Sequence, residues 1–416
     1  MNMGKRALLA KLIQDIRASY WFLPSSLICL AVLLAQLTLF LDQNPAWVPM
    51  ELPKALRATQ VDGARSLMSI ISQSVFGVAG VMFSMTIVAV SFASGNFGPR
   101  LIGNFMRDRG NQWSLGILVA TFVYALLITR AIQSPTGAEA DLSTSLFVPH
   151  LSILIALGLT FVSVFTVVYF VHHIPETINV SNITAGLGNR LVHDIKALIK
   201  DQSGKQGGAV TFPGGDPDRT LTLGQSGYIQ TMNKEQLAAL AQKHDLLIDV
   251  PLPVGTFVTE DTIVLRIWGA DIPTEAHENL HASFALGHSP TESQNLLFIV
   301  NQLVEMIARA MSPGVNDPFT AINCLNWLHS AAVTGANYQG GLGAVETGKV
   351  RTGQISFGDL LQAGFGAARP YTKSDALCDR HQRLIFDQLG SQITAPDHLE
   401  TLRAFIDRLE QPGDAA

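Results

Sequence analysis

The motif with the clearest chemical potential in this sequence is His277-Glu278-Asn279-Leu280-His281, which matches the H-E-x-x-H arrangement of zinc hydrolases. On a helix the two histidines would share one face and could bind zinc, and the glutamate could activate a zinc-bound water. The metzincin continuation is absent, because position 284 is Phe and His288 is misplaced. A third ligand would have to be Glu292 or Glu305, and the sequence selects neither. We therefore predict surface or helix-packing histidines, with a zinc hydrolase as the alternative.

A second chemical pattern, the phosphate-binding loop G-x-x-x-x-G-K, occurs at 343–349. Val350 stands where this loop needs a Mg²⁺-binding Ser or Thr, and a helix rather than a strand is expected before it. The three cysteines, Cys29, Cys324 and Cys378, show no metal-motif spacing and indicate buried or reduced thiols. The sequence therefore predicts no cofactor and no metal site, and it leans against an enzyme.

Polar side chains also gather in the string Ser-Pro-Gly-Val-Asn-Asp-Pro-Phe-Thr at 312–320. Aspartate at an N-cap followed by proline at the first helical position is a strong helix start. The string is thus explained as a rigid corner between two helices. The alternative is a ligand or ion site at the helix N-terminus, to which four side chains would offer oxygens: Ser312, Asn316, Asp317 and Thr320.

The elements that must position these residues are dominated by membrane spans. Charged residues make up 15% of the 416, against about 25% in soluble domains, and mean hydropathy is +0.27. Between Arg65 and Arg100 lie 34 consecutive uncharged residues. A spanning helix needs about 20 apolar residues, and four segments qualify: 22–41, 70–94, 113–131 and 149–171. The net charge of -5 gives no basic field for nucleic acid.

Basic residues in the short loops predict the orientation of these spans. They precede the first span and lie between the second and third: Lys5, Arg6, Lys11, Arg17, Arg100, Arg107 and Arg109. The loop between the third and fourth spans carries only Glu139 and Asp141. We therefore predict a membrane protein whose N-terminus (1–21) and C-terminal half lie in the cytosol, with the lipid bilayer as its partner.

The second span carries one column of mostly small residues at alternating spacings of three and four, which we call the seam: Gly77, Gly80, Ser84, Ile87, Ser91, Ser94 and Gly98. Small residues let helix backbones approach closely in lipid, so the seam predicts helix packing. The alternative is a pore-lining face in an oligomer, wetted by the hydroxyls. No ionisable side chain lies in the seam, which argues against ion- or proton-coupled transport.

The C-terminal half is predicted to be an α+β region that is mostly helical. Apolar spacing indicates an amphipathic juxtamembrane helix over 172–200, where His172 and His173 should be solvated caps, with pH sensing as the alternative. Glycine and proline mark a linker at 201–220. A small α/β or β-barrel-like unit is expected over 221–270, with a helix at 234–243 capped by Asn233. A helical domain should occupy 271–416.

Several strings resemble a family of bacterial predicted inner-membrane proteins known only as a domain of unknown function. They are Phe83-Ser84, Phe97-Gly98-Pro99-Arg100-Leu101, the run from Asn104 to Arg109, Gly227-Tyr228-Ile229-Gln230, the string from Ala310 to Ala321, and Phe386-Asp387-Gln388. The resemblance covers nearly the whole chain. It implies four N-terminal spans and a cytosolic C-terminal region, and it supplies no catalytic residue.

Two functional hypotheses of different class follow. The first is an oligomeric, channel-like conduit in which the second span lines or seals a pore and the cytosolic half assembles or gates it. The second is a membrane-anchored zinc hydrolase that uses His277, Glu278 and His281. A membrane scaffold or sensor with neither activity is a third alternative.

Overall fold

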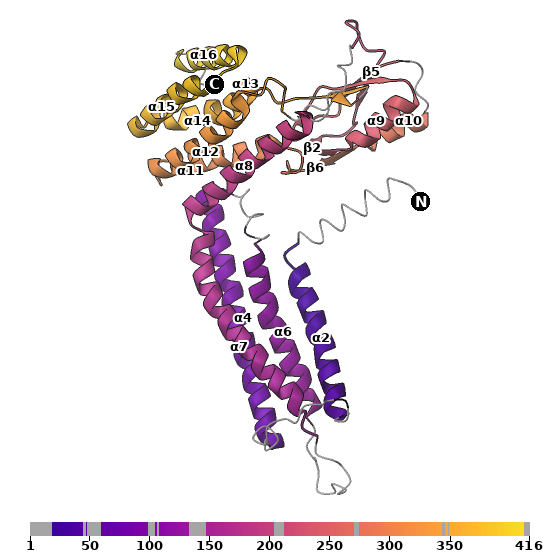
Figure 1. The fold of residues 1–416 in the computed structure, drawn as a ribbon, viewed down its shortest axis with the longest axis vertical. Coiled ribbons are helices and arrows are strands. Elements are labelled where there is room, and N and C mark those ends of the chain that lie inside the picture. Colours follow the sequence, from indigo (N-terminus) through magenta and orange to yellow (C-terminus); the bar gives the residue numbers. More distant parts are fainter. Residues whose placement is uncertain are drawn as a thin grey trace. The chain divides into compact units, whose positions relative to one another are not determined.

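The computed structural model describes residues 19–44, 47, 60–98, 105, 108–132, 147–203, 212–269, 274–342, 346–347 and 349–411 (Figure 1). The chain divides into two compact units. The first comprises Met1–Gly95 and Pro99–Asn179, and the second comprises Asn96–Gly98 and Val180–Ala416. Most of the predicted N-terminal segment 1–21 lies outside the described residues, as does most of the glycine-rich string at 343–348.

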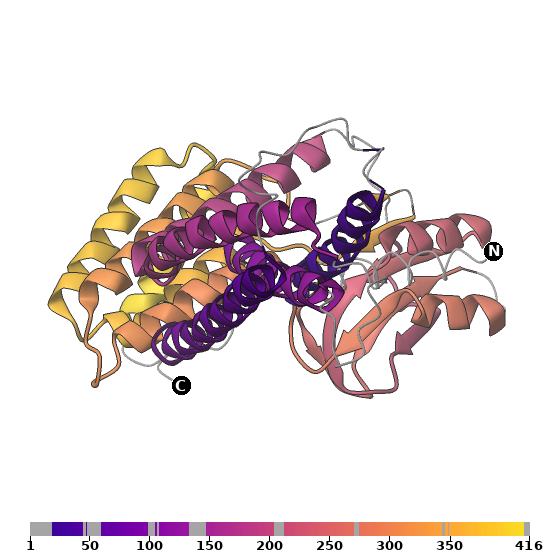
Figure 2. The same ribbon diagram turned by 90° about the horizontal axis from the view of Figure 1, so that it is seen from below.

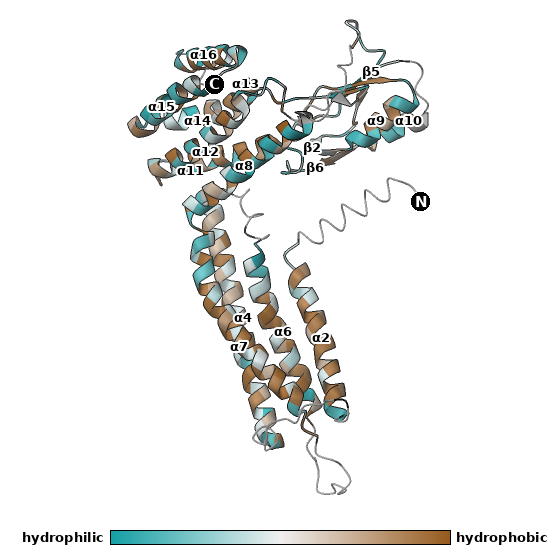
Figure 3. Cartoon of the chain, viewed as in Figure 1, coloured by the Kyte–Doolittle hydropathy of each residue, from teal (hydrophilic) through white to brown (hydrophobic). Residues whose placement is uncertain are grey.

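All four segments predicted as spans are long helices of the first unit: α2 (Phe22–Gln43), α4 (Val61–Phe97), α6 (Arg109–Ala131) and α7 (His150–Thr177). Each is long and apolar enough to cross a membrane, which confirms the predicted count. Hydrophobic residues predominate along the four helices (Figure 3). Only 22% to 39% of each apolar stretch is buried within the chain, so most of this surface is left for lipid or another protein.

The four helices alternate in direction. Gly116 of α6 lies against Pro24 at the start of α2, so these two helices begin at the same end of the bundle. Asp42 at the end of α2 binds the first turn of α7, and Arg65 in the first turns of α4 donates to the carbonyl of Ile132, at the end of α6, at 2.9 Å. The bundle is therefore up-down-up-down, as expected of four consecutive spans.

Helix α4 differs most from its prediction. It has 37 residues and begins at Val61 rather than at residue 70. At a rise of about 1.5 Å per residue it is roughly 55 Å long. Asp62 lies in its first turn, where a negative charge is favoured by the helix dipole. One face of α4 packs in the core of the bundle through Ala64, Met68, Ile71, Val75, Ala79 and Met82.

The second unit contains a layer of helices (Figure 2): α8 (Val180–Ser203), α11 (Leu296–Ala310), α12 (Pro318–Ala336), α13 (Phe357–Leu361), α14 (Ala367–Thr372), α15 (Ala376–Gln392) and α16 (Pro396–Glu410). A π-helix, η3 (Gln362–Gly366), joins α13 to α14. Helix α12 lies at the centre, because α8, α11 and α15 all pack against it. Its buried face is rich in small residues: Ala321, Cys324, Ala331, Ala332, Gly335 and Ala336.

The predicted amphipathic segment begins later than expected. Helix α7 continues to Thr177 with Pro175 in its last turns, and only Ile178 and Asn179 separate it from α8. The predicted packing face of α8 is present, because Leu187, Leu191 and Ile195 are fully buried.

Two sheets and two helices make up the rest of the second unit: β1 (Arg219–Thr222), β2 (Gly227–Met232), α9 (Lys234–Lys243), β3 (Leu247–Val250), β4 (Phe257–Val258), β5 (Ile263–Trp268), α10 (Thr274–His281), β6 (Phe284–Gly287), β7 (Glu346–Thr347) and β8 (Val350–Thr352). One sheet has the order β1-β5-β3-β8-β7 and the other β4-β2-β6. The predicted helix 234–243 is α9, and the Asn233 side chain caps it. Strands β6, β7 and β8 come from outside the predicted 221–270 unit and complete its sheets.

Candidate functional site

The seam on α4 is mostly exposed. Its members from Gly77 to Ser91 are exposed side by side along the helix, Ser94 is half-buried and Gly98 is buried. A Cβ atom added at Gly77 or Gly80 would meet no atom of the described residues within 4 Å. The seam therefore has room for another backbone to approach closely.

The seam lies away from the face that α4 uses inside the chain. At about 100° per residue, the buried residues of α4 and the seam are centred roughly 150° apart around the helix axis. The buried residues Val75, Met82 and Ala89 alternate with the exposed Gly77, Ser84 and Ser91. Helix packing through the seam, which the sequence predicts, therefore needs a partner other than the described spans of the same chain.

The other three spans are joined by buried hydroxyls. Tyr124 Oη lies 2.9 Å from Thr38 Oγ1 and donates to the Ser152 carbonyl at 3.1 Å. Ser163 donates to Thr121 Oγ1 at 3.0 Å. These contacts link α2, α6 and α7 by neutral hydrogen bonds, which satisfy polar groups that would otherwise be unpaired in lipid.

Carboxylates lie at opposite ends of this bundle. Asp42 accepts hydrogen bonds from the backbone N–H groups of Leu151 and Ser152, both at 2.9 Å, and so caps α7. At the other end Asp108 caps α6 and lies 2.8 Å from His173 Nε2. His173 is only 19% exposed and stacks on Tyr169, so the expectation that it is a solvated cap is wrong.

A shallow groove of ≈ 300 Å³ runs between α6 and α7. Its lining is almost entirely apolar: Trp113, Ser114, Ile117, Val162, Phe165, Thr166 and Tyr169. Trp113 and Tyr169 are about half exposed there, as expected of aromatics at the edge of a bilayer. The groove offers surface for an acyl chain and no group that could do chemistry.

The 312–320 string folds as a corner between α11 and α12. Asp317 is the N-cap of α12 and accepts hydrogen bonds from Thr320 N at 3.1 Å and from Thr320 Oγ1 at 2.5 Å. Ser312 donates to the Arg309 carbonyl at 2.7 Å, and Asn316 takes a left-handed backbone conformation with φ of 47°. Three of the four candidate ligand side chains are thus engaged in the corner itself, which accounts for their residue types.

The His277–His281 pair lies on one face of α10, with ring centroids 4.8 Å apart. Burial lowers the pKa of His281, and the neighbouring His277 adds to the effect. The two glutamates considered as a third ligand are used elsewhere, Glu292 against Arg190 at 2.9 Å and Glu305 against Arg309 at 3.6 Å. Throughout the part of the chain that the structure describes, no three His, Cys, Asp or Glu side chains are placed to hold a metal ion.

Most of the phosphate-loop pattern at 343–349 lies outside the described residues, namely 343–345 and 348. Lys349 pairs with Asp245, and Val350 begins β8.

The two C-terminal thiols are buried, which raises the pKa of both Cys324 and Cys378 to about 12. At neutral pH neither thiol is a nucleophile.

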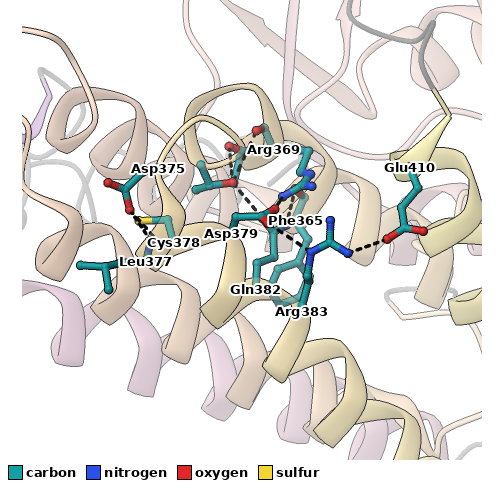
Figure 4. Close-up of polar contacts among 11 residues, drawn as sticks. Phe365, Arg369, Asp375, Leu377, Cys378, Asp379, Gln382, Arg383 and Glu410 are labelled. Atoms are coloured by element: carbon teal, nitrogen blue, oxygen red, sulfur yellow. Dashed lines mark hydrogen bonds and ion pairs between the residues drawn. The ribbon is translucent and has the colours of Figure 1, made fainter.

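One ionic cluster was not predicted from the sequence (Figure 4). Arg369 of α14 pairs with Asp379 of α15 at 2.5 Å, Asp379 accepts from Arg383 at 3.1 Å, and Arg383 reaches Glu410 of α16 at 2.9 Å. The Arg369 guanidinium holds the pKa of Asp379 below its usual value. Gln382 of α15 accepts from Thr372 at 2.8 Å and donates to the Phe365 carbonyl within the π-helix. This cluster joins the three C-terminal helices.

Known proteins resemble this chain over most of its length. A family model described as predicted membrane protein (DUF2254) matches residues 17–386. The chain belongs to this family. It is 28% identical over 275 residues to "Uncharacterized protein Rv1290c" of Mycobacterium tuberculosis and to "Uncharacterized protein Mb1321c" of Mycobacterium bovis.

Each of these alignments covers 64% of this chain and 51% of the relative, so the chain spans about half the length of the curated relatives it matches. No solved structure matches the chain. Family membership confirms the resemblance read from the sequence, and with the four apolar helices it establishes a membrane protein.

Proposed function

We propose that this protein is an oligomeric, channel-like membrane conduit in which the seam of α4 contacts α4 of neighbouring copies and lines or seals the passage between them. The observation that carries the proposal is the outward position of the seam. In lipid, helix association depends on close packing of small residues. A column of glycine and serine facing hydrocarbon would lose packing contacts without gaining a partner.

The chemistry of the seam limits what such a conduit would do. The exposed hydroxyls of Ser84 and Ser91 are two helical turns apart on one line and could hydrate a lumen. The whole run between Arg65 and Arg100 is uncharged, so this part of α4 offers no group to couple transport to a proton or an ion gradient. We therefore propose passive conduction.

Substitutions in the seam test this proposal. In Ser84→Leu and Ser91→Leu, bulky side chains would separate neighbouring α4 helices or fill the lumen. We expect the oligomer seen by native mass spectrometry to dissociate toward the 44.9 kDa chain, or flux through reconstituted vesicles to fall by about ten-fold. The matched controls are Val78→Leu and Met85→Leu, which share the seven-residue spacing, are 37% and 53% exposed, and lie roughly 130° to 150° around the α4 axis from the centre of the seam.

The outcome separates the candidates. Equal behaviour of the seam and control variants would contradict packing through the seam. Two results together would overturn the conduit proposal. The protein would remain a single chain in mild detergent and in native nanodiscs, and it would conduct nothing under voltage, tension or a pH step.

We also propose that the protein lies in a bacterial inner membrane with its N-terminus and second unit in the cytosol. The loop charges support this orientation, because basic residues precede α2 and lie between α4 and α6. A reporter fused after Glu410 should be active only in its cytosolic form. Activity of a periplasm-specific reporter at that position would reverse the topology.

A further inference from the structure

Four large side chains are exposed at one end of the helical layer of the second unit. We call them the corner patch: Val315 (50% exposed), Phe319 (74%), Tyr371 (44%) and Leu377 (49%). They come from the α11–α12 corner, the first turn of α12, the last turn of α14 and the first turn of α15. Cys378 Sγ lies 3.7 Å from the Pro318 carbonyl, so the starts of α12 and α15 are neighbours.

The packing of α8 on α12 shows where this end lies along the chain. Asn323 donates to Thr184 Oγ1 at 3.0 Å, and a Cβ on Gly188 would lie 2.2 Å from the ring of Trp327. Both pairs are separated by 139 positions, so α8 and α12 run in the same direction. Phe319 is therefore level with Val180, the first residue of α8.

Covalent connections limit how far this end of the layer can lie from the bilayer. Val180 follows the spanning helix α7 after only Ile178 and Asn179, and each residue extends the chain by at most about 3.6 Å. A second connection agrees with the first, because a Cβ on Gly98 would lie 2.6 Å from Glu305 of α11. Gly98 directly follows α4 and still belongs to the charge-free run of that span.

The chemistry of the patch fits a lipid surface. Phenylalanine, tyrosine and leucine favour the boundary between headgroups and acyl chains, where an apolar body meets a polar edge. Lys373 is exposed beside Tyr371 and would favour anionic headgroups. Val315 and Phe319 flank the N-cap of α12 on a corner whose backbone is fixed by Asp317 and Asn316, so the apolar groups are held outward without an ordering cost.

We propose that the corner patch rests in the headgroup layer of the same bilayer that the spans cross, as a second, peripheral attachment of the second unit. The proposal does not depend on conduction or on oligomerisation. A neighbouring copy or another protein would cover the patch in a different way, and the experiment separates these cases.

The test uses the full-length protein in nanodiscs, labelled with a fluorophore at single introduced cysteines. Cys29→Ser removes the exposed native thiol, and Cys324 and Cys378 are fully buried. The probes are Phe319→Cys and Leu377→Cys. The matched control is Leu384→Cys, because Leu384 is 50% exposed on the same helix, two turns or about 10 Å further from the patch. The quencher is a lipid with a nitroxide near its headgroup.

We expect quenching at 319 and 377 to be at least about two-fold stronger than at 384, since a headgroup layer is only about 6 Å thick. The stronger quenching should persist when each disc holds one chain, and anionic lipid should increase it. Equal quenching at all three positions would overturn the proposal. The proposal would also be overturned if the probes at 319 and 377 are shielded from aqueous iodide but are not quenched by the lipid, because that result indicates a protein partner. Unchanged melting temperatures of the three variants show that the fold is retained.

Discussion

The seam of α4 and the helical layer of the second unit differ in the direction that their small residues face, outward from the bundle in the first and inward between helices in the second. In the second unit, Gly188 of α8 faces the Trp327 ring, and Ala331, Ala332 and Gly335 of α12 are buried between helices. On α4 the comparable residues, Gly77 and Gly80, face outward into open space. Close packing in the second unit is therefore completed within the chain. The same residue types on α4 indicate packing that one chain does not complete.

The two regions also differ in how they bury polar groups. The contacts inside the span bundle are neutral hydroxyl bonds such as Thr38–Tyr124, whereas the second unit holds a mostly buried ion pair between Arg369 and Asp379. Burying a charge is costly, and in lipid there is no water to complete its shell. The solvent of each region thus decides which polar contacts can hold its helices together.

The largest expected effect comes from breaking the ionic cluster. Arg369→Met would leave the Asp379 carboxylate without its most buried partner, and removing one partner of a buried pair costs about 3 kcal/mol. We expect a clear fall in the melting temperature of the purified protein. Arg383→Met is the control, because Arg383 is 56% exposed and should cost less than about 1 kcal/mol. Equal losses in the two variants would contradict a special role for Arg369.

Glycine substitutions test the inward packing directly. Gly188→Ala puts a methyl group 2.2 Å from the Trp327 ring, and such overpacking costs about 2 kcal/mol. Gly186→Ala, on the same helix, meets nothing within 4 Å and should stabilise by up to about 1 kcal/mol through helix propensity. Thermal denaturation should therefore move in opposite directions for the two variants. A neutral Gly188→Ala would show that α8 does not pack tightly on α12.

Removal of one hydroxyl measures the neutral contacts of the bundle. Tyr124→Phe deletes the bonds to Thr38 and Ser152, and interhelical bonds in membranes are worth about 0.6 kcal/mol on average. Thr160→Val is the comparison, because the Thr160 hydroxyl donates to the Ala156 carbonyl of its own helix rather than to another span among the described residues. Unfolding in mixed micelles should show a small loss for the first variant and a smaller one for the second. A loss as large as that of Arg369→Met would remove the distinction between the two regions.

The smallest effect concerns pH. The pKa of Asp379 is lowered in the folded state, so its contribution to stability is fully present above its unfolded value of about 4. That contribution is lost as pH falls through the lower, folded value. The difference in melting temperature between the wild-type protein and Asp379→Asn should be constant from pH 8 to 5 and should shrink only in stronger acid. A difference that shrinks between pH 7 and 6 would implicate another group.

Local patterns in the sequence predicted the features that local physics controls. Long apolar runs gave the four spans, and the Asp317-Pro318 pair gave the start of α12, because hydropathy and capping act within a few residues. The period of the seam was also readable. Its direction was not, because a helical column faces whichever side the tertiary contacts leave open.

Features that join segments far apart in the chain could not be predicted from the sequence. Strand β8 pairs in parallel with β3, which lies about a hundred residues earlier in the chain. Strands this short carry no sequence pattern from which their pairing partners could be predicted. Arg369 sits immediately before Pro370, where a helix end and an exposed side chain would be the usual expectation. Helix α14 instead continues past Pro370 to Thr372, and the guanidinium is largely buried beside Asp379.

The unequal lengths of the spans set a condition on the membrane itself. At about 1.5 Å per residue, α2 and α6 match a hydrocarbon layer of roughly 30 Å, while the uncharged run of α4 is closer to 50 Å. Hydrophobic mismatch of this size is relieved by tilting one helix or by locally thickening the bilayer. The protein is therefore coupled to bilayer thickness mainly through α4, the longest span, whose outer face carries the seam. Helix α7, with 28 residues or about 42 Å, adds to the mismatch.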